Sequence, residues 1–324
     1  KIEIDCRGNV LLKVGATDMG QGSDTILAQL AANATGIDYE DFFVISSDTS
    51  QTPEGGVTTA SRQTYISGHA VLGAAGVFMT VLREFLEKAF TLHAGEYELI
   101  AGGVRILHPK GKMRHAGEFS DAVPDFIAYQ SLASVAEKLG IILAGEFVYT
   151  APVTYPLRER ADHEPGVPLE EYNIHFAYCF GTQAAVVEVN ENTGEVKVIK
   201  IIAAQDLGKA IHPQNCHCQI EGAVVMGMGY ALSEEFVLEN GKMVTDTMAK
   251  LNLTRITAMP EIETILIEEE SDGPCGAKGM GELPINPTAP AIINAIYDAV
   301  GVRITDLPAT KEKILAALKK RDRE

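Results

Sequence analysis

The strongest constraint on the fold is a helical pattern that extends from Gln63 to Ala89. Apolar residues recur there every three or four positions, so one side of a helix would be continuously apolar. They are Val71, Ala74, Ala75, Phe78, Leu82 and Leu86. The pattern predicts a single long helix whose apolar side is buried against other elements.

Short alternating segments on both sides of this helix predict strands. Two hairpins are expected, one from residues 2–5 and 10–14, the other from residues 183–189 and 196–203. Further strands are expected over residues 42–46, 141–149 and 262–268, and further helices over residues 23–33, 121–139, 214–232, 285–300 and 311–320. Because strands and helices do not strictly alternate, we expect an α+β fold.

The length of 324 residues favours two mixed α+β domains. Residues 150–168 are rich in proline and charge, which is typical of a linker or a surface loop. We therefore expect a first domain over residues 1–150 and a second over residues 151–324.

The chain is strongly acidic, with 27 basic and 44 acidic side chains and a formal net charge of −17. Binding to nucleic acid or to an anionic membrane needs positive charge, so neither is an expected partner. No uninterrupted apolar run approaches the roughly 18–20 residues that span a bilayer. Five cysteines are too few for a disulfide scaffold, and a cytoplasmic location is expected.

Common cofactor and metal motifs are missing from the sequence. It has no G-x-x-x-x-G-K-S/T sequence, no G-x-G-x-x-G after a strand and no H-E-x-x-H. Cys216 and Cys218 stand too close for a zinc ribbon, and the cysteines cannot supply the four ligands of an iron–sulfur cluster. Glycine-rich loops that precede helices remain as candidate binding elements.

Two of these loops suit an anionic ligand. Gly20–Gln21–Gly22 precedes a helix, where backbone N–H groups can point at an anion and small residues allow close approach. Thr58–Thr59–Ala60–Ser61–Arg62 adds hydroxyls, exposed amides and one guanidinium suited to phosphate. Taken alone, each loop is also explained as an ordinary helix N-terminus.

A third loop, from Gly273 to Pro284, carries glycine at positions 273, 276, 279 and 281. So many glycines are costly unless the backbone needs positive φ or another group must come close. The loop leads to Glu282, just before Leu283 and Pro284. This carboxylate is either the N-cap of the following helix or a general base in a confined site, and the residues alone leave both open.

Together these loops resemble the molybdenum hydroxylases, the family of xanthine dehydrogenase and aldehyde oxidase. Residues 18–22 are similar to the family's G-Q-G pterin loop, and residues 58–62 to its next cofactor loop. Residues 206–213, followed by 219–222, resemble the segment with a second pterin-facing glutamine, here Gln219. Residues 279–282 resemble the catalytic glutamate motif. The motifs stand in the family's order over essentially the whole chain.

The resemblance implies the fold of the C-terminal half of the family's molybdenum-cofactor-binding region, with Glu282 as the catalytic base. Molybdenum would be held by the pterin dithiolene, with no metal ligand from the protein, and the pterin would be the cytosine dinucleotide form. The implied cofactor contacts are Gly20, Gln21, Gly22, Thr59, Ala60, Ser61, Arg62, Gln63, Gln219, Lys278, Gly279, Met280 and Gly281.

The resemblance also implies a reaction and its partners. An electron-poor N-heterocycle would be hydroxylated with oxygen from water, nicotinate to 6-hydroxynicotinate being the expected case. Electrons would pass through 2Fe–2S clusters and FAD on partner subunits to NAD(P)+. The family's molybdenum subunit is about twice this long, so a second molybdopterin-binding chain is expected to supply the N-terminal half, as in nicotinate-hydroxylating members from anaerobic bacteria.

Several alternatives stay open at this point. The substrate can instead be a purine such as xanthine, with the same cofactors, because the other half of the molybdenum-binding region largely sets specificity. From a different class, the chain can be a non-catalytic cofactor-holding or assembly subunit. A dimer of hetero-oligomers is expected, but the sequence does not distinguish a sulfur from a selenium ligand on molybdenum, or NAD from NADP.

Overall fold

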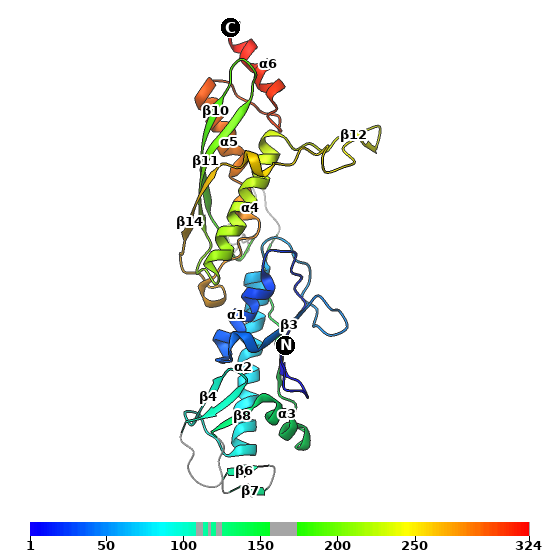
Figure 1. The fold of residues 1–324 in the computed structure, drawn as a ribbon, viewed down its shortest axis with the longest axis vertical. Coiled ribbons are helices and arrows are strands. Elements are labelled where there is room, and N and C mark those ends of the chain that lie inside the picture. Colours follow the sequence, from blue (N-terminus) through cyan, green and yellow to red (C-terminus); the bar gives the residue numbers. More distant parts are fainter. Residues whose placement is uncertain (108–112, 116–117, 121–124, 156–173, 324) are drawn as a thin grey trace, which may run out of the picture. The chain divides into compact units, whose positions relative to one another are not determined.

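The computed structural model describes residues 1–107, 113–115, 118–120, 125–155 and 174–323 (Figure 1). Their contacts form two compact units, the first made of Lys1–Tyr178 and Ser271–Gly279, the second of Cys179–Glu270 and Met280–Glu324. The expected domain limits of 1–150 and 151–324 stay a prediction. Most of the expected linker, residues 156–168, lies outside the described residues.

A mixed four-stranded sheet lies in the first unit, in the order β3-β2-β1-β9. β1 (Ile2–Ile4) and β2 (Val10–Val14) pair antiparallel, which confirms the first predicted hairpin. β3 (Phe42–Ser46) is parallel to β2, and β9 (Ala144–Gly145) is antiparallel to β1. Alternate residues of β1 and β2 are buried, as in a sheet with one covered face.

Two helices pack against each other and against this sheet: α1 (Ser23–Thr35) and the long α2 (Gln63–Phe90). All six residues predicted for the apolar side of the long helix are buried. Although its apolar run is interrupted, α2 is long and apolar enough to cross a membrane by length and composition alone. Half of its apolar stretch is buried inside the unit, which also fits a core helix.

Two expectations for the middle of the chain are wrong. The helix expected over residues 121–139 is shorter and forms α3 (Tyr129–Lys138). Its expected first part contains β8 (Phe126–Ala128), which pairs as a strand with β5 (Gly103–Ile106). Residues 121–124 lie outside the described part. Among the described residues, the strand expected over residues 141–149 pairs only at β9. The other small elements are η1 (Tyr39–Asp41), β4 (Tyr97–Ile100), which pairs with β5, and the pair β6 (Met113–His115) and β7 (Glu118–Ser120).

The second unit contains a three-stranded sheet. β10 (Gly181–Val189) and β11 (Val196–Asp206) pair antiparallel, which confirms the second predicted hairpin, and β14 (Glu261–Ile267) lies parallel to β11. Helices α4 (Pro213–Leu232) and α5 (Thr288–Val300) pack on this sheet, and α6 (Lys311–Arg321) contributes to the same core (Figure 1). Five fully buried isoleucines lie in this core: Ile201, Ile220, Ile292, Ile296 and Ile314.

The helix predicted over residues 285–300 begins later than expected. A short 3-10 helix, η6 (Leu283–Ile285), comes first, and α5 starts after Pro287, which occupies its N-cap position. Because proline has no N–H and restricts the residue before it, closely spaced prolines at 284 and 287 favour a break at this point.

Within the second unit, residues 233–259 connect α4 to β14 and form a segment that we call the apolar arm. It contains the small pair β12 (Leu238–Glu239) and β13 (Lys242–Met243) and the 3-10 helix η4 (Ile256–Ala258). The sequence did not predict these elements. Large apolar side chains are exposed along the arm: Phe236, Leu238, Met243, Val244, Met248, Leu253, Ile256 and Met259.

Candidate functional site

Asp18 organises the G-Q-G loop of the first unit. Its carboxylate accepts hydrogen bonds from the backbone N–H groups of Gly20 at 2.8 Å, Gly22 at 3.3 Å and Asp24 at 3.0 Å. Burial favours the protonated acid, but these hydrogen bonds outweigh it and hold the pKa of Asp18 below its usual value. The amides expected to face an anionic ligand therefore face a carboxylate of the protein itself.

Gln21 closes the same loop with its carboxamide. Its Oε1 accepts a hydrogen bond from Met19 N at 2.6 Å, and its Nε2 donates to Thr17 O at 3.2 Å and to Ser23 Oγ at 3.0 Å. The side chain is half-buried, while Gly20 beside it is exposed. Gln21 thus shapes the loop in this chain, and its contact with a cofactor stays a prediction.

The second loop lies directly against the first. The Thr17 N–H donates to Thr58 Oγ1 at 3.0 Å, and that hydroxyl lies 3.1 Å from Thr17 O. The buried Gln63 donates its Nε2 to the same hydroxyl at 2.7 Å. Folding therefore joins two predicted cofactor loops that are 41 residues apart in sequence.

The second loop is also strained. Ala60 and Ser61 both have φ of 52°, in the left-handed region that disfavours residues with a side chain. Such strain costs about 1–3 kcal/mol per residue and is common at ligand sites. The Arg62 guanidinium donates through Nη1 to Gly55 O at 3.0 Å and to Val57 O at 2.8 Å, so it holds the loop, and its contact with a phosphate stays a prediction.

The third loop meets the second at Gly279. A Cβ added to Gly279 would lie 1.7 Å from Ser61 O, so no other residue fits without movement. The close approach predicted from the glycine content is confirmed at this position. At the start of the loop, the Tyr65 hydroxyl donates to Asp272 Oδ2 at 2.9 Å, and burial together with this carboxylate raises the pKa of Tyr65. Lys278 is half-buried.

Glu282 lies in the second unit, at the N-cap position of η6. It is exposed, and within the described part of the chain its side chain makes no capping hydrogen bond to this helix. The N-cap alternative therefore lacks the bond that it requires. Met280, two residues earlier, packs against the core of the same unit.

Gln219 holds the backbone just before Glu282. Its Nε2 donates to Gly281 O at 2.7 Å. Gln219 lies on α4, whose first turn begins at Pro213 and is capped by His212 Nδ1, which accepts from Asn215 N at 3.2 Å. The motif over residues 206–222 thus forms a strand-to-helix turn that brings its glutamine to the loop of the predicted base.

The sequence did not single out two residues that contact the same segment. Gln183 donates its Nε2 to Pro284 O at 2.6 Å, and the Thr288 hydroxyl donates to Gln183 Oε1 at 2.8 Å. The sequence of β10 contained a signal for Gln183. Ala185 and Val187 pack against the core, and Gln183 is a polar residue on the same face of the strand, where an apolar residue is expected.

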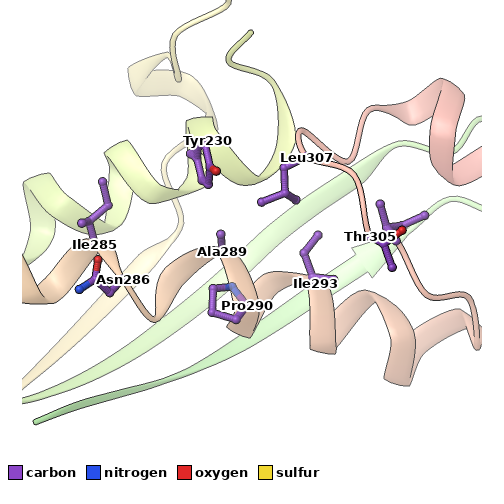
Figure 2. Close-up of a pocket in the computed structure, with 9 residues that line it drawn as sticks. Tyr230, Ile285, Asn286, Ala289, Pro290, Ile293, Thr305 and Leu307 are labelled. Carbon is purple, nitrogen blue, oxygen red and sulfur yellow. The ribbon is translucent and has the colours of Figure 1, made fainter. Parts of the chain in front are cut away.

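A pocket of 490 Å³ lies near this segment in the second unit (Figure 2). Its walls come from α4, from η6 and α5, and from the residues after α5. They are mostly apolar, with Asn286 and Thr305 among the polar residues, and none of the predicted site residues lines it. The lining residues are Tyr230, Ile285, Asn286, Ala289, Pro290, Ile293, Ile304, Thr305 and Leu307.

The groups present in the three loops fit a ligand that is bound by loop backbone and neutral side chains. Among the described residues, no group of three or more His, Cys, Asp or Glu side chains is arranged to hold a metal ion. A cofactor that brings its own metal ligands needs from the chain only backbone and neutral side chains at close range. The loops joined at Thr17 and Thr58 and at Ser61 and Gly279 contain such groups, and the amides of Gly20 and Gly22 would have to exchange Asp18 for the ligand.

Comparison with known proteins gives a family match over most of the chain. The family model for the molybdopterin cofactor-binding domain matches residues 1–260. The chain is 29% identical over 323 residues to the gamma subunit of the 6-hydroxypseudooxynicotine dehydrogenase complex of Paenarthrobacter nicotinovorans, covering 97% of this chain and 37% of that protein. It is 28% identical over 319 residues to a probable xanthine dehydrogenase subunit of Bacillus subtilis, covering 98% and 39%.

Among solved structures, the aldehyde oxidoreductase of Desulfovibrio desulfuricans matches with a TM-score of 0.71 and 28% identity, over 98% of this chain and 30% of that one. The likeness confirms the predicted α+β fold. The chain spans less than two fifths of the length of these relatives.

Proposed function

This chain belongs to the molybdopterin cofactor-binding domain family, and we propose that it forms part of the molybdenum-binding subunit of a multi-subunit hydroxylase of the xanthine dehydrogenase kind. Since it spans less than two fifths of its relatives, further polypeptide would be needed to complete the active site.

The setting of Glu282 carries this proposal. Its carboxylate is exposed, and the carbonyl of the preceding residue is held by Gln219. A carboxylate placed in this way on a fixed backbone is suited to accept a proton from a bound reactant. Glu282 is therefore the proposed general base.

The proposed cofactor is molybdenum–molybdopterin cytosine dinucleotide, which when bound would supply the two-electron oxidation. Residues 20–22, 59–63 and 278–281, with Gln219, would hold it. The strained pair Ala60 and Ser61 and the joined loops support this placement. Binding of its phosphates by Arg62 would require that guanidinium to exchange its bonds to Gly55 O and Val57 O.

In the proposed reaction, Glu282 accepts the proton of a water-derived hydroxyl as it attacks an electron-poor ring carbon next to nitrogen. A ring C–H and a water molecule become C–OH, with release of two electrons and two protons. The electrons would pass through 2Fe–2S clusters and FAD to NAD(P)+.

Nicotinate, converted to 6-hydroxynicotinate, is the proposed substrate, and the chain would correspond to the medium molybdopterin subunit of a nicotinate dehydrogenase. The relative named for 6-hydroxypseudooxynicotine supports a nicotine-related substrate. The relative named as a probable xanthine dehydrogenase favours a purine as the second candidate. Rates on nicotinate and on xanthine, measured with the full complex, decide between the two.

Proposed partners are a second molybdopterin-binding chain, a 2Fe–2S subunit and an FAD subunit, assembled in the cytoplasm as a dimer of hetero-oligomers. The exposed apolar side chains of the arm support a partner, because large exposed apolar patches are rare on monomers. Whether molybdenum carries sulfur or selenium is a property of the cofactor.

The test starts with elemental mass spectrometry of the native complex, where about one molybdenum per copy of this chain is expected. Glu282→Gln should retain the metal but lower turnover by about 10²–10⁴-fold, because an amide cannot accept the proton. Near-normal turnover in a metal-replete Glu282→Gln complex would contradict the role of Glu282 and favour a non-catalytic cofactor-holding subunit. A complex without molybdenum would refute the proposal as a whole.

A further inference from the structure

The segment that carries Glu282 is held at both ends by glutamine carboxamides. Before Glu282, Gly281 O accepts a hydrogen bond from Gln219 at 2.7 Å. After it, Pro284 O accepts one from Gln183 Nε2 at 2.6 Å. The two carbonyls flank the residue whose side chain must be placed accurately, and only Gln219 belongs to a motif of the sequence.

The orientation of the Gln183 carboxamide is set by Thr288. The Thr288 hydroxyl donates to Gln183 Oε1 at 2.8 Å, which leaves Nε2 as the end that faces Pro284 O. Since a carbonyl oxygen can only accept, the reverse orientation would lose the bond to Pro284 O.

Rigid elements carry both residues. Gln183 lies on β10, paired with Ala203 of β11. Thr288 is the first residue of α5 and is fully buried, and it packs tightly against α4, because a Cβ added to Gly227 would lie 2.5 Å from Thr288 Cβ. Groups on strands and helices hold a site more accurately than groups on loops.

Helix capping alone does not explain the bond from Gln183. The Thr288 hydroxyl also lies 3.3 Å from Pro284 O, four residues earlier, which is an ordinary contact in a first helical turn. Gln183, however, reaches the same carbonyl from a strand 101 residues away. Glycine gives the loop before Glu282 conformational freedom. The hydrogen bond from Gln183 on the sheet restricts the backbone that follows this loop.

We propose that Gln183 and Thr288 are positioning residues that fix the backbone on the C-terminal side of Glu282. The inference rests on the function proposed above. Without this anchor, the carboxylate would be displaced from the reacting atoms while the cofactor loops of the first unit remain unchanged.

The test uses the purified native complex with five variants of this chain. Gln183→Met and Thr288→Val remove the hydrogen bonds at nearly constant volume, and Thr288→Ser restores the hydroxyl. Thr182→Ala is the matched control, because Thr182 is the exposed neighbour on β10 whose side chain lies on the opposite face. Glu282→Gln reports on the proposed function itself.

We expect Gln183→Met and Thr288→Val to lower kcat about 10- to 100-fold, the effect of a small misplacement, with KM and molybdenum content near wild type. Peptides that span residues 279–288 should exchange their amide hydrogens faster than in wild type. Thr288→Ser and Thr182→Ala should retain normal kcat and normal exchange.

Wild-type kcat and exchange in Gln183→Met and Thr288→Val, in a complex that Glu282→Gln inactivates, would overturn the positioning role and leave the proposed function intact. An equal loss in Thr288→Ser would also overturn it, because the hydroxyl would then be irrelevant. Full turnover in Glu282→Gln would refute the proposed function instead. The hydrogen-exchange result alone would then show whether Gln183 and Thr288 fix the backbone after Glu282.

Discussion

A methyl group at position 279 tests whether the second and third loops meet as the structure shows. The Cβ of Gly279→Ala would lie 1.7 Å from Ser61 O, whereas real Cβ contacts essentially never fall below 3.0 Å. The two loops must therefore separate by about 1.3 Å. The obstacle is a backbone carbonyl on a residue already held at φ of 52°, so rotation of a side chain cannot relieve it. Overpacking of this kind costs about 1–3 kcal/mol.

We expect Gly279→Ala to lower both the melting temperature and the molybdenum content of the native complex. The matched control is Gly76→Ala, an exposed position on α2 where, apart from the adjacent backbone of the helix, no described atom lies within 4 Å of the added Cβ. Alanine is favoured over glycine inside a helix by up to about 1 kcal/mol, so the control should be unchanged or slightly more stable. Wild-type melting and metal content in Gly279→Ala would refute the close approach of the loops.

Three further predictions concern the G-Q-G loop of the first unit and the apolar arm of the second. Gln21→Ala should reduce molybdenum content, because it removes the bonds to Met19 N and Ser23 Oγ that shape the loop, and an unchanged content would count against the predicted contact. The pKa of Asp18 is lowered from 3.8, so its contribution to stability is present at neutral pH and is lost as the pH falls below about 3.8. Asp18→Asn should therefore reduce the difference in unfolding free energy between pH 7 and pH 3, and an equal difference in both proteins would refute the argument. The chain expressed alone should aggregate through its apolar arm, and a soluble monomer with a cooperative melt would contradict this.

Elements with strong local periodicity were predicted nearly to the residue. The stripe from Val71 to Leu86 identified the buried side of α2, and alternation around two turns identified both hairpins. The errors lie where pairing depends on distant residues. The strand at residues 126–128 forms because β5 lies beside it. The sequence predicted a helix there, because the helical pattern of the residues that follow was extended over the strand.

For the candidate site, the glycine-rich sequences identified the loops but not the partners of their polar groups. Asp18 accepts hydrogen bonds from the amides of Gly20 and Gly22, and Arg62 donates to the carbonyls of Gly55 and Val57, just before its loop. A motif shows which donors are present, but the fold decides which acceptors come within hydrogen-bond distance of them.

The sequence by itself determined the order of most helices and strands, the three glycine-rich loops and the position of Glu282, because these follow from periodicity and residue type over short stretches. Only the tertiary structure decided that Ser61 lies against Gly279 and that Gln183 and Thr288 anchor Pro284. Gln183 and Pro284 are 101 positions apart, and Ser61 and Gly279 are still further apart. Such pairs come together only when the sheets and helices pack.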